Sequence, residues 1–122
     1  MLSKLERELK KFVLDRDWDQ FHSVRNLVTQ LSCESAELLE HFIWSQDDKH
    51  LQDPETLKNI KEEIGDVLNC LVLIASKLNI DLPQCGLDKL KKTAKKYPVE
   101  LAKGKSLKYN KLKENNKNGT PN

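Results

Sequence analysis

Apolar residues recur every three or four positions along most of this chain, which is the repeat of an α-helix with one buried face. In the stretch from 24 to 44 the recurring positions are Val24, Leu27, Leu31, Leu38 and Phe42. No segment shows the alternation of apolar and polar residues, bounded by turns, that indicates a β-strand. The pattern therefore predicts an all-α fold.

Residues that cap helices stand where three helices are expected to start, namely Ser3, Ser23 and Asp53, and a fourth helix is expected after Asp81-Leu82-Pro83. Glu6 follows Ser3 at the spacing of a capping box, and Pro54 follows Asp53 as a first-turn proline. We expect helices over residues 4–15, 24–44, 54–79 and 82–96. The segment 16–22 predicts a packed connector because it carries two large aromatic residues, and 45–53 predicts a polar loop.

The second half of the third expected helix is apolar on nearly all sides from Val67 onward. A helix of this kind is usually buried, and a chain of this size could hardly cover it alone. No heptad repeat continues past one helix, which argues against an elongated coiled coil. We therefore expect a four-helix bundle that assembles into a homo-oligomer.

Length and composition agree with one helical domain. The chain has 122 residues, of which 33% are charged and 38% hydrophobic, and it has only four glycines and four prolines, so its turns should be few. We expect the domain to span residues 1–112. Residues 113–122 include no large apolar side chain and predict a disordered tail.

The net charge of +2 gives no strong field toward nucleic acid or a membrane, and we expect neither as a partner. Lysines are nevertheless concentrated between positions 89 and 113, a stretch that contains ten lysines and only one acidic residue, Glu100. This concentration leaves an alternative open. The chain could be a non-enzymatic helical module that binds RNA or a protein partner through the basic region 89–113.

The cysteines indicate a reducing compartment, because Cys33, Cys70 and Cys85 are odd in number and lack a CxxC spacing. The opening residues MLSKLEREL lack the apolar stretch of a signal peptide. The longest apolar run, residues 67–75, is much shorter than the ~20 residues of a membrane helix. We expect a cytoplasmic protein.

Two acidic pairs carry the candidate chemistry: Glu34 with Glu37, and Glu63 with Asp66. Residues three apart on a helix are neighbours, so each pair directs two carboxylates the same way. Helical geometry puts Glu34 at the edge of an apolar stripe, and puts Glu63 and Asp66 among apolar residues. Ionised carboxylates seldom stay in such surroundings unless they are paired or bind a metal.

Facing pairs on two packed helices, ~8–10 Å apart, could gather four carboxylates around one or two cations. Their hard oxygen ligands favour Mg²⁺, with Mn²⁺ as a second possibility. Such a site suits the hydrolysis of phosphate anhydrides. The simpler interpretation is that both pairs are solvated surface charges, which arise easily in a chain with 19 acidic residues. Gly65, inside the second pair, suggests close approach by another backbone or a ligand.

Four blocks of sequence together resemble the MazG-like nucleotide pyrophosphohydrolases, in the branch that includes the dCTP pyrophosphatases. The blocks are RDWDQFHSVRN (16–26), ESAELLEHFIW (34–44), EEIGDVL (62–68) and KKYPVELAKGKSLKYNKL (95–112). The resemblance covers roughly residues 12–112. It implies an all-α homodimer or homotetramer that cleaves a nucleoside triphosphate to the monophosphate and pyrophosphate, a house-cleaning activity on the nucleotide pool.

The resemblance also implies roles for individual residues. Glu34, Glu37, Glu63 and Asp66 match the family's catalytic metal ligands, which bind Mg²⁺. Trp18 and Trp44 match its aromatic base pocket, and His22 is expected near the substrate. The candidates to meet phosphate oxygens are Arg25, Lys96, Lys103, Lys105, Lys108 and Tyr109.

The sequence departs from the family at three positions. Cys70 stands where dCTP-cleaving members commonly carry an aromatic residue, Thr93 where related sequences often have Asn, and Val24 where they often have Pro. The change at Cys70 leaves the preferred base open. The expected substrate is dCTP or a related pyrimidine or modified nucleotide, with dUTP and damaged nucleotides as alternatives.

Overall fold

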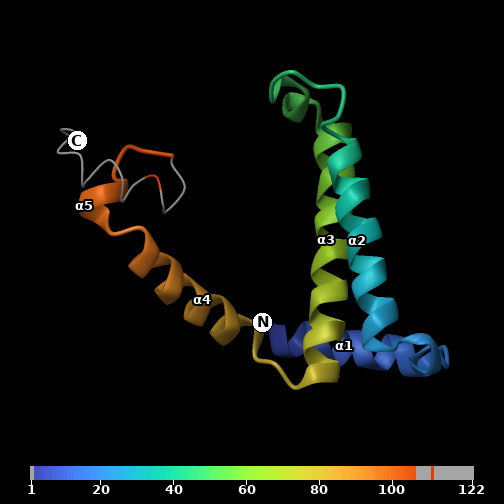
Figure 1. Cartoon of the computed structure of the whole chain (residues 1–122). Coiled ribbons are helices and arrows are strands. Elements are labelled where there is room, and N and C mark those ends of the chain that lie inside the picture. Colours follow the sequence, from blue (N-terminus) through green and yellow to red (C-terminus); the bar gives the residue numbers. More distant parts are fainter. Residues whose placement is uncertain (1, 107–110, 112–122) are drawn as a thin grey trace. The chain divides into compact units, whose positions relative to one another are not determined.

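The computed structural model describes residues 2–106 and 111, and these residues form helices and turns with no strand. The all-α prediction is therefore confirmed. The chain divides into two compact units, Met1–Ile80 and Asp81–Asn122, each of which is considered by itself (Figure 1). Five α-helices lie in the described residues, one more than predicted.

The first unit opens with helix α1 (Leu2–Asp15), whose only buried residue is Val13. Ser3 lies inside this helix, so its prediction as the capping residue was wrong. After Asp17, which has a positive φ of 54°, the short 3-10 helix η1 (Asp19–Phe21) completes the connector to the next helix. Phe21 remains 60% exposed, so the connector is packed only in part.

Helix α2 (Val24–Glu40) starts where the sequence predicted, because the hydroxyl of Ser23 accepts a hydrogen bond from the backbone N–H of Asn26 at 3.1 Å. The predicted end at Trp44 was wrong. The helix stops at Glu40, and residues 41–44 form turns. Apolar residues at 42–44 continued the helical pattern in the sequence, although the backbone had already left the helix.

The segment between α2 and α3 holds a second 3-10 helix, η2 (Lys49–Gln52). Phe42 and His50 pack edge to face, with ring centres 5.0 Å apart, and the Nδ1 atom of His50 lies 2.9 Å from the hydroxyl of Ser45. The expected polar loop is thus a folded turn with its own contacts.

Helix α3 (Pro54–Leu78) has the predicted start and end. The carboxylate of Asp53 accepts a hydrogen bond from the Thr56 N–H at 2.9 Å, and Pro54 occupies the first turn. Asn79 closes the helix in the left-handed conformation, with φ 54° and ψ 45°.

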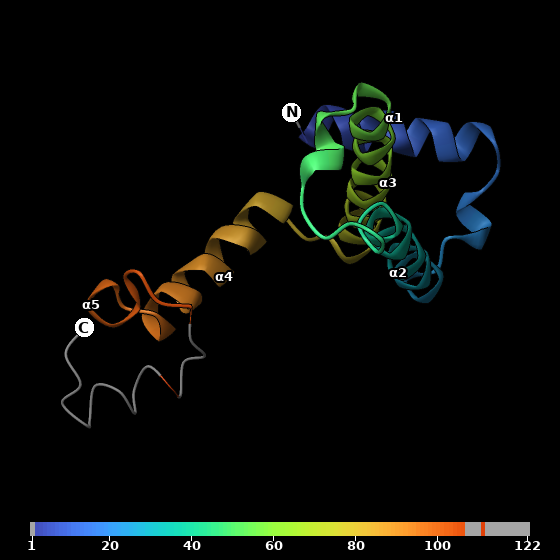
Figure 2. The same cartoon turned by 90° about the horizontal axis from the view of Figure 1, so that it is seen from above.

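Helices α2 and α3 lie side by side and run in opposite directions, and α1 crosses their lower ends in the view of Figure 1. Figure 2, seen from above, shows the same pairing of α2 with α3. The core between these helices is small and consists of Val13, Leu27, Ile60, Cys70, Val72 and Ala75. A hairpin of two long helices is thus the scaffold on which both acidic pairs stand.

The second unit contains α4 (Leu82–Lys96) and the short helix α5 (Val99–Ala102), which the sequence analysis missed. Asp81 caps α4, since its carboxylate accepts a hydrogen bond from the Gln84 N–H at 3.1 Å. Neither helix has a buried residue. The predicted tail 113–122 lies outside the described residues.

A search of the described helices finds none whose length and apolar character would let it cross a bilayer.

Candidate functional site

The two acidic pairs meet on the hairpin. Glu34 and Glu37 come from α2, and Glu63 and Asp66 come from α3. One carboxylate oxygen of each of the four residues lies within 4.8 Å of the others. We refer to these four residues as the carboxylate quartet. The two acidic pairs therefore converge from two packed helices, as expected from the sequence.

The quartet consists of one half-buried residue and one exposed residue from each helix. Glu34 and Glu63 are half-buried, and Glu37 and Asp66 are exposed. The Oε2 atoms of Glu34 and Glu63 are both buried and have no hydrogen-bond partner within the described part of the chain. Leaving a buried carboxylate oxygen unpaired costs free energy, so these two atoms are suited to a cation placed between the helices.

The electrostatics of the quartet favour the same ligand. Loss of water around Asp66, together with the negative charges of Glu34 and Glu62, raises the pKa of its carboxyl group. Burial, followed by the charges of Glu34 and Asp66, likewise raises the pKa of the Cys70 thiol. Both groups resist further negative charge, and a divalent cation would relieve that repulsion.

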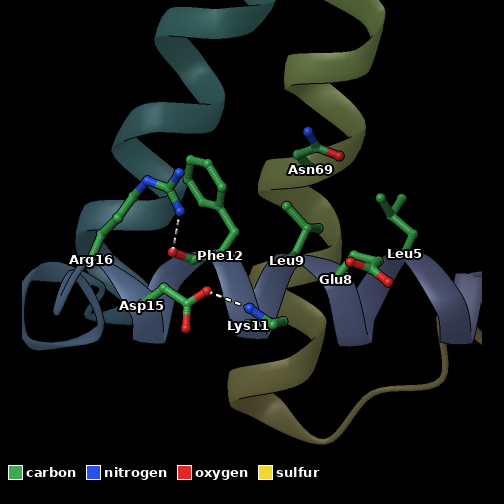
Figure 3. A pocket seen from close by; sticks show the side chains of 8 residues that line it. All are labelled: Leu5, Glu8, Leu9, Lys11, Phe12, Asp15, Arg16 and Asn69. Carbon is green, nitrogen blue, oxygen red and sulfur yellow. Dashed lines mark hydrogen bonds and ion pairs between the residues drawn. The ribbon is translucent and has the colours of Figure 1, made fainter.

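A hollow of about 440 Å³ lies along α1. Figure 3 shows Leu5, Leu9 and Phe12 rising from α1 toward Asn69 of α3. The guanidinium of Arg16 stands over the Phe12 ring at 3.6 Å from its centre and donates to the Phe12 carbonyl at 3.0 Å.

This hollow was missed from the sequence. Asn69 is three residues after Asp66 and therefore its neighbour on the surface of α3. The spacing of Asn69 from Asp66 could have indicated that Asn69 lies beside the quartet. The residues that α1 adds to the hollow could not be predicted, because they depend on how α1 crosses α3 in the folded protein.

His22 lines a second hollow of about 240 Å³, together with Leu27 and Leu73. Its Nδ1 atom is buried without a hydrogen-bond partner among the described residues. At the rim, Lys77 and Asp19 form an ion pair at 2.7 Å, which lowers the pKa of Asp19. His22 thus occupies a pocket, although it is not part of the quartet.

The predicted base-pocket residues have different surroundings. Trp18 is 45% exposed and meets Phe12 edge to face, with ring centres 5.6 Å apart, so it adjoins the hollow on α1. Trp44 is 94% exposed in the turn after α2. Arg25 is exposed in the first turn of α2. Among the described contacts, none joins Trp18, Trp44 and Arg25 to one another.

The predicted phosphate-binding lysines belong to the second unit. Lys96 ends α4, while Lys103 and Lys105 follow α5. Lys96 and Lys103 are exposed, and Lys105 is half-buried. Lys108 and Tyr109 lie outside the described residues.

Gly65 is not approached by any described part of the chain, because a Cβ atom built there would meet nothing within 4 Å. The close approach suggested by the sequence is thus not made within the chain.

The sequence profile of the MazG-like family matches residues 29–112, which include most of α2, all of α3 and the whole quartet. The chain belongs to the MazG-like family. This MazG-like chain is 37% identical over 114 residues to the dCTP pyrophosphatase 1 proteins of Bos taurus and Homo sapiens. The matched region covers 91% of the chain and 68% and 67% of those two relatives, respectively.

Solved structures give a consistent result. The MazG-like chain is similar to the crystal structure of a pyrophosphatase from Archaeoglobus fulgidus, with a TM-score of 0.71 and 32% sequence identity. The similarity covers 79% of this chain and 91% of that structure. Relatives found by sequence and by structure are thus both named as pyrophosphatases, as the resemblance noted in the sequence implied.

Proposed function

We propose that this chain hydrolyses a nucleoside triphosphate to the monophosphate and pyrophosphate, with the carboxylate quartet as its catalytic centre. The enzyme class follows from the family and from the pyrophosphatases to which the chain is similar. The observation that supports this location is the gathering of four carboxylates within 4.8 Å, two of them with a buried and unpaired oxygen.

Mg²⁺ fits this donor set, and Mn²⁺ is the second candidate. Glu34, Glu37, Glu63 and Asp66 would hold the metal, since carboxylate oxygens are the ligands that these hard cations prefer. When bound, such an ion polarises phosphate oxygens and makes water a stronger nucleophile near neutral pH.

The protein's own contribution is to hold negative side chains in place before the substrate arrives. Because Glu34 and Glu63 are half-buried on two packed helices, their carboxylates have little freedom to turn into solvent. Glu37 and Asp66 are exposed and form the open side, from which a triphosphate can approach. No protein nucleophile is required in this scheme.

We further propose that the nucleoside lies toward the hollow on α1. Asn69 brings an amide one helical turn beyond Asp66, and Phe12 with Trp18 supplies aromatic surface. His22, Arg25, Trp44, Lys96, Lys103, Lys105, Lys108 and Tyr109 remain proposed substrate contacts. Residues 1–112 are proposed to act as one domain.

The proposed substrate is dCTP or a related pyrimidine or modified nucleotide. The curated relatives are dCTP pyrophosphatases. Cys70 is buried and small, and it lies four residues beyond Asp66 on α3. The family resemblance puts position 70 at the base site, where a cysteine would leave more space than an aromatic ring, and this favours bases with an added substituent.

A homodimer or homotetramer is proposed from the exposed apolar surface of α3. Ile64, Leu68, Leu71 and Leu78 are 51%, 38%, 37% and 49% exposed, respectively. Long apolar side chains along one helix are costly to leave in water, and a second copy of the chain would cover them.

The test is release of pyrophosphate from a panel of ribo- and deoxyribonucleoside triphosphates, with and without Mg²⁺. We expect activity only with the metal, and a loss of at least about 100-fold in Glu63→Gln. Glu62→Gln, which removes an exposed carboxylate one residue away, is the matched control and should keep most of the activity. Full activity in Glu63→Gln would rule out the quartet as the catalytic centre, and silence across the panel would favour the non-enzymatic binding module.

A further inference from the structure

Helix α2 presents a stripe of polar side chains that is longer than the acidic pair. Gln30, Glu34, Glu37 and His41 follow one another at steps of four, three and four residues. Side chains at these steps lie on the same face of a helix. The two glutamates of the quartet are therefore flanked along α2 by one uncharged amide and one imidazole.

Gln30 contacts the quartet directly. Its Nε2 atom donates a hydrogen bond to Oε1 of Glu34 at 2.6 Å. The other oxygen of the same carboxylate, Oε2, is buried and unpartnered among the described residues. The amide thus occupies one oxygen of Glu34 and leaves the second, buried oxygen available for a cation.

His41 has the corresponding place at Glu63, but it acts across the two helices. It follows the last residue of α2, and its Nε2 atom lies 3.7 Å from Oε1 of Glu63 on α3. Both side chains are mostly covered, with 25% and 22% of their surface exposed. Oε2 of Glu63 is again buried and without a partner in the described residues.

We propose that Gln30 and His41 are positioning residues of the metal site, each orienting one half-buried glutamate so that its free oxygen faces the cation. This inference rests on the proposed function, because it requires a metal at the quartet. Gln30 is suited to this role since an amide donates a hydrogen bond without neutralising the carboxylate. A lysine there would add a positive charge that repels the metal.

The expected effect is on metal affinity rather than on chemistry. A glutamate side chain has several rotatable bonds, and an outer hydrogen bond removes part of the freedom that metal binding would otherwise have to freeze. Loss of such an outer partner typically weakens metal binding by about 10-fold to 100-fold. The contact of Gln30 is shorter than that of His41, so Gln30 should have the larger effect.

The experiment uses Gln30→Met, which keeps the length and helix propensity of the side chain but removes the donor. The chain offers a matched control in Gln84→Met. Gln84 makes the same type of bond within α4, from Nε2 to Oδ1 of Asp88 at 2.8 Å, and neither residue belongs to the quartet or to the proposed substrate contacts. His41→Phe is the second variant, and Glu63→Gln is the reference for a lost ligand.

Titration calorimetry with Mg²⁺ alone should show affinity about 10-fold weaker in Gln30→Met, with a smaller loss in His41→Phe and none in Gln84→Met. At saturating Mg²⁺, kcat of both positioning variants should return to near the parent value. Thermal unfolding without metal provides the check that each variant is folded.

Affinity for Mg²⁺ equal to that of the parent in both positioning variants would overturn the inference. So would a loss of kcat that saturating Mg²⁺ does not restore, because that result would indicate a structural or catalytic role instead. Failure of the proposed function has a different signature: the parent chain itself would bind no Mg²⁺ and release no pyrophosphate, and the inference would fail with it.

Discussion

Helices α3 and α4 begin with the same kind of cap but differ in how many of their residues are buried. In each, an aspartate at the start accepts a backbone N–H, Asp53 from Thr56 and Asp81 from Gln84, and a proline stands in the first turn. Yet α3 buries Ile60, Cys70, Val72 and Ala75, whereas α4 buries none of its residues. Local sequence thus determines where a helix begins, while burial depends on what packs against it.

The acidic residues of α3 and α4 differ in the same way, because only those of α3 meet carboxylates from another helix. On α3, Glu63 and Asp66 face a second helix that brings two more carboxylates. On α4, Asp88 is also three or four residues from polar neighbours, but it is satisfied by Gln84 of its own helix. An acidic residue becomes a candidate ligand only where tertiary packing brings others to it.

The largest expected difference is in core packing. Ile60→Ala should destabilise the protein by about 2–5 kcal/mol, because Ile60 is only 6% exposed and its removal leaves a cavity. Leu87→Ala on α4, where the side chain is 53% exposed, should change stability by no more than about 0.5 kcal/mol. Urea unfolding followed by circular dichroism measures both. A large cost at Leu87 would break the contrast and indicate that another protein surface covers α4.

A smaller effect is expected from charge. Asp66 has a raised pKa in the folded state, so its ionisation opposes folding, and this cost appears as the pH rises from the ordinary carboxyl pKa through the raised one. Without metal at neutral pH, Asp66→Asn should therefore have a higher Tm than the parent, and the gap should close in acid. Mg²⁺ should raise the Tm of the parent more than that of the variant.

Asp88→Asn on α4 is the control for this charge effect, since the Asp88 carboxylate accepts a hydrogen bond from Gln84. No rise in Tm is expected there, with or without Mg²⁺. An equal rise in both variants would mean that the gain at Asp66 reflects general charge reduction and not the quartet.

The smallest expected effect is at the helix caps. Hydrogen bonds from Thr56 lower the pKa of Asp53, so its stabilising contribution is present above its ordinary pKa and is lost as the pH falls through the lowered value. Asp53→Ala should lower Tm by roughly a few degrees at neutral pH. Differential scanning calorimetry across pH should show this difference vanishing in acid.

Asp81→Ala tests the same cap on α4. Because α4 has no buried residue, loss of its cap should reduce the helical circular dichroism signal with little change in the main unfolding transition. Equal shifts of Tm in the two cap variants would show that α4 unfolds together with the hairpin.

Much of the fold could be predicted because its signals are local. Ser23 and Asp53 gave two helix starts correctly, the run Asp81-Leu82-Pro83 marks the start of α4, and Asn79 marks the end of α3. The end of α2 was placed too late because Phe42 and Ile43 keep the apolar pattern through a turn. Helix α5 was missed because four residues are too few to show a period.

For the candidate site, too, the signal available in the sequence was local, namely the spacing of acidic residues within single helices. Spacing on single helices predicted that four carboxylates would converge, and they do. It also put Glu34 and Glu63 beside apolar residues, where they are half-buried, but it put Asp66 there too, and the structure leaves Asp66 exposed. It could not identify Phe12 or Arg16, which reach the neighbourhood only because α1 crosses α3. The surroundings of Trp44 were equally unpredictable, since its exposure depends on where the helix before it stops.

Insertions and deletions should be tolerated in some parts of the hairpin and not in others. An inserted residue between Glu34 and Glu37, or between Glu63 and Asp66, would rotate one ligand by about 100° and remove it from the cluster. The turn over residues 45–53, beyond His41 and Trp44, joins the helices at one end and contributes no residue to the quartet or to the proposed substrate contacts. Insertions and deletions among relatives should therefore collect in the turn and be excluded from the helical segments on either side.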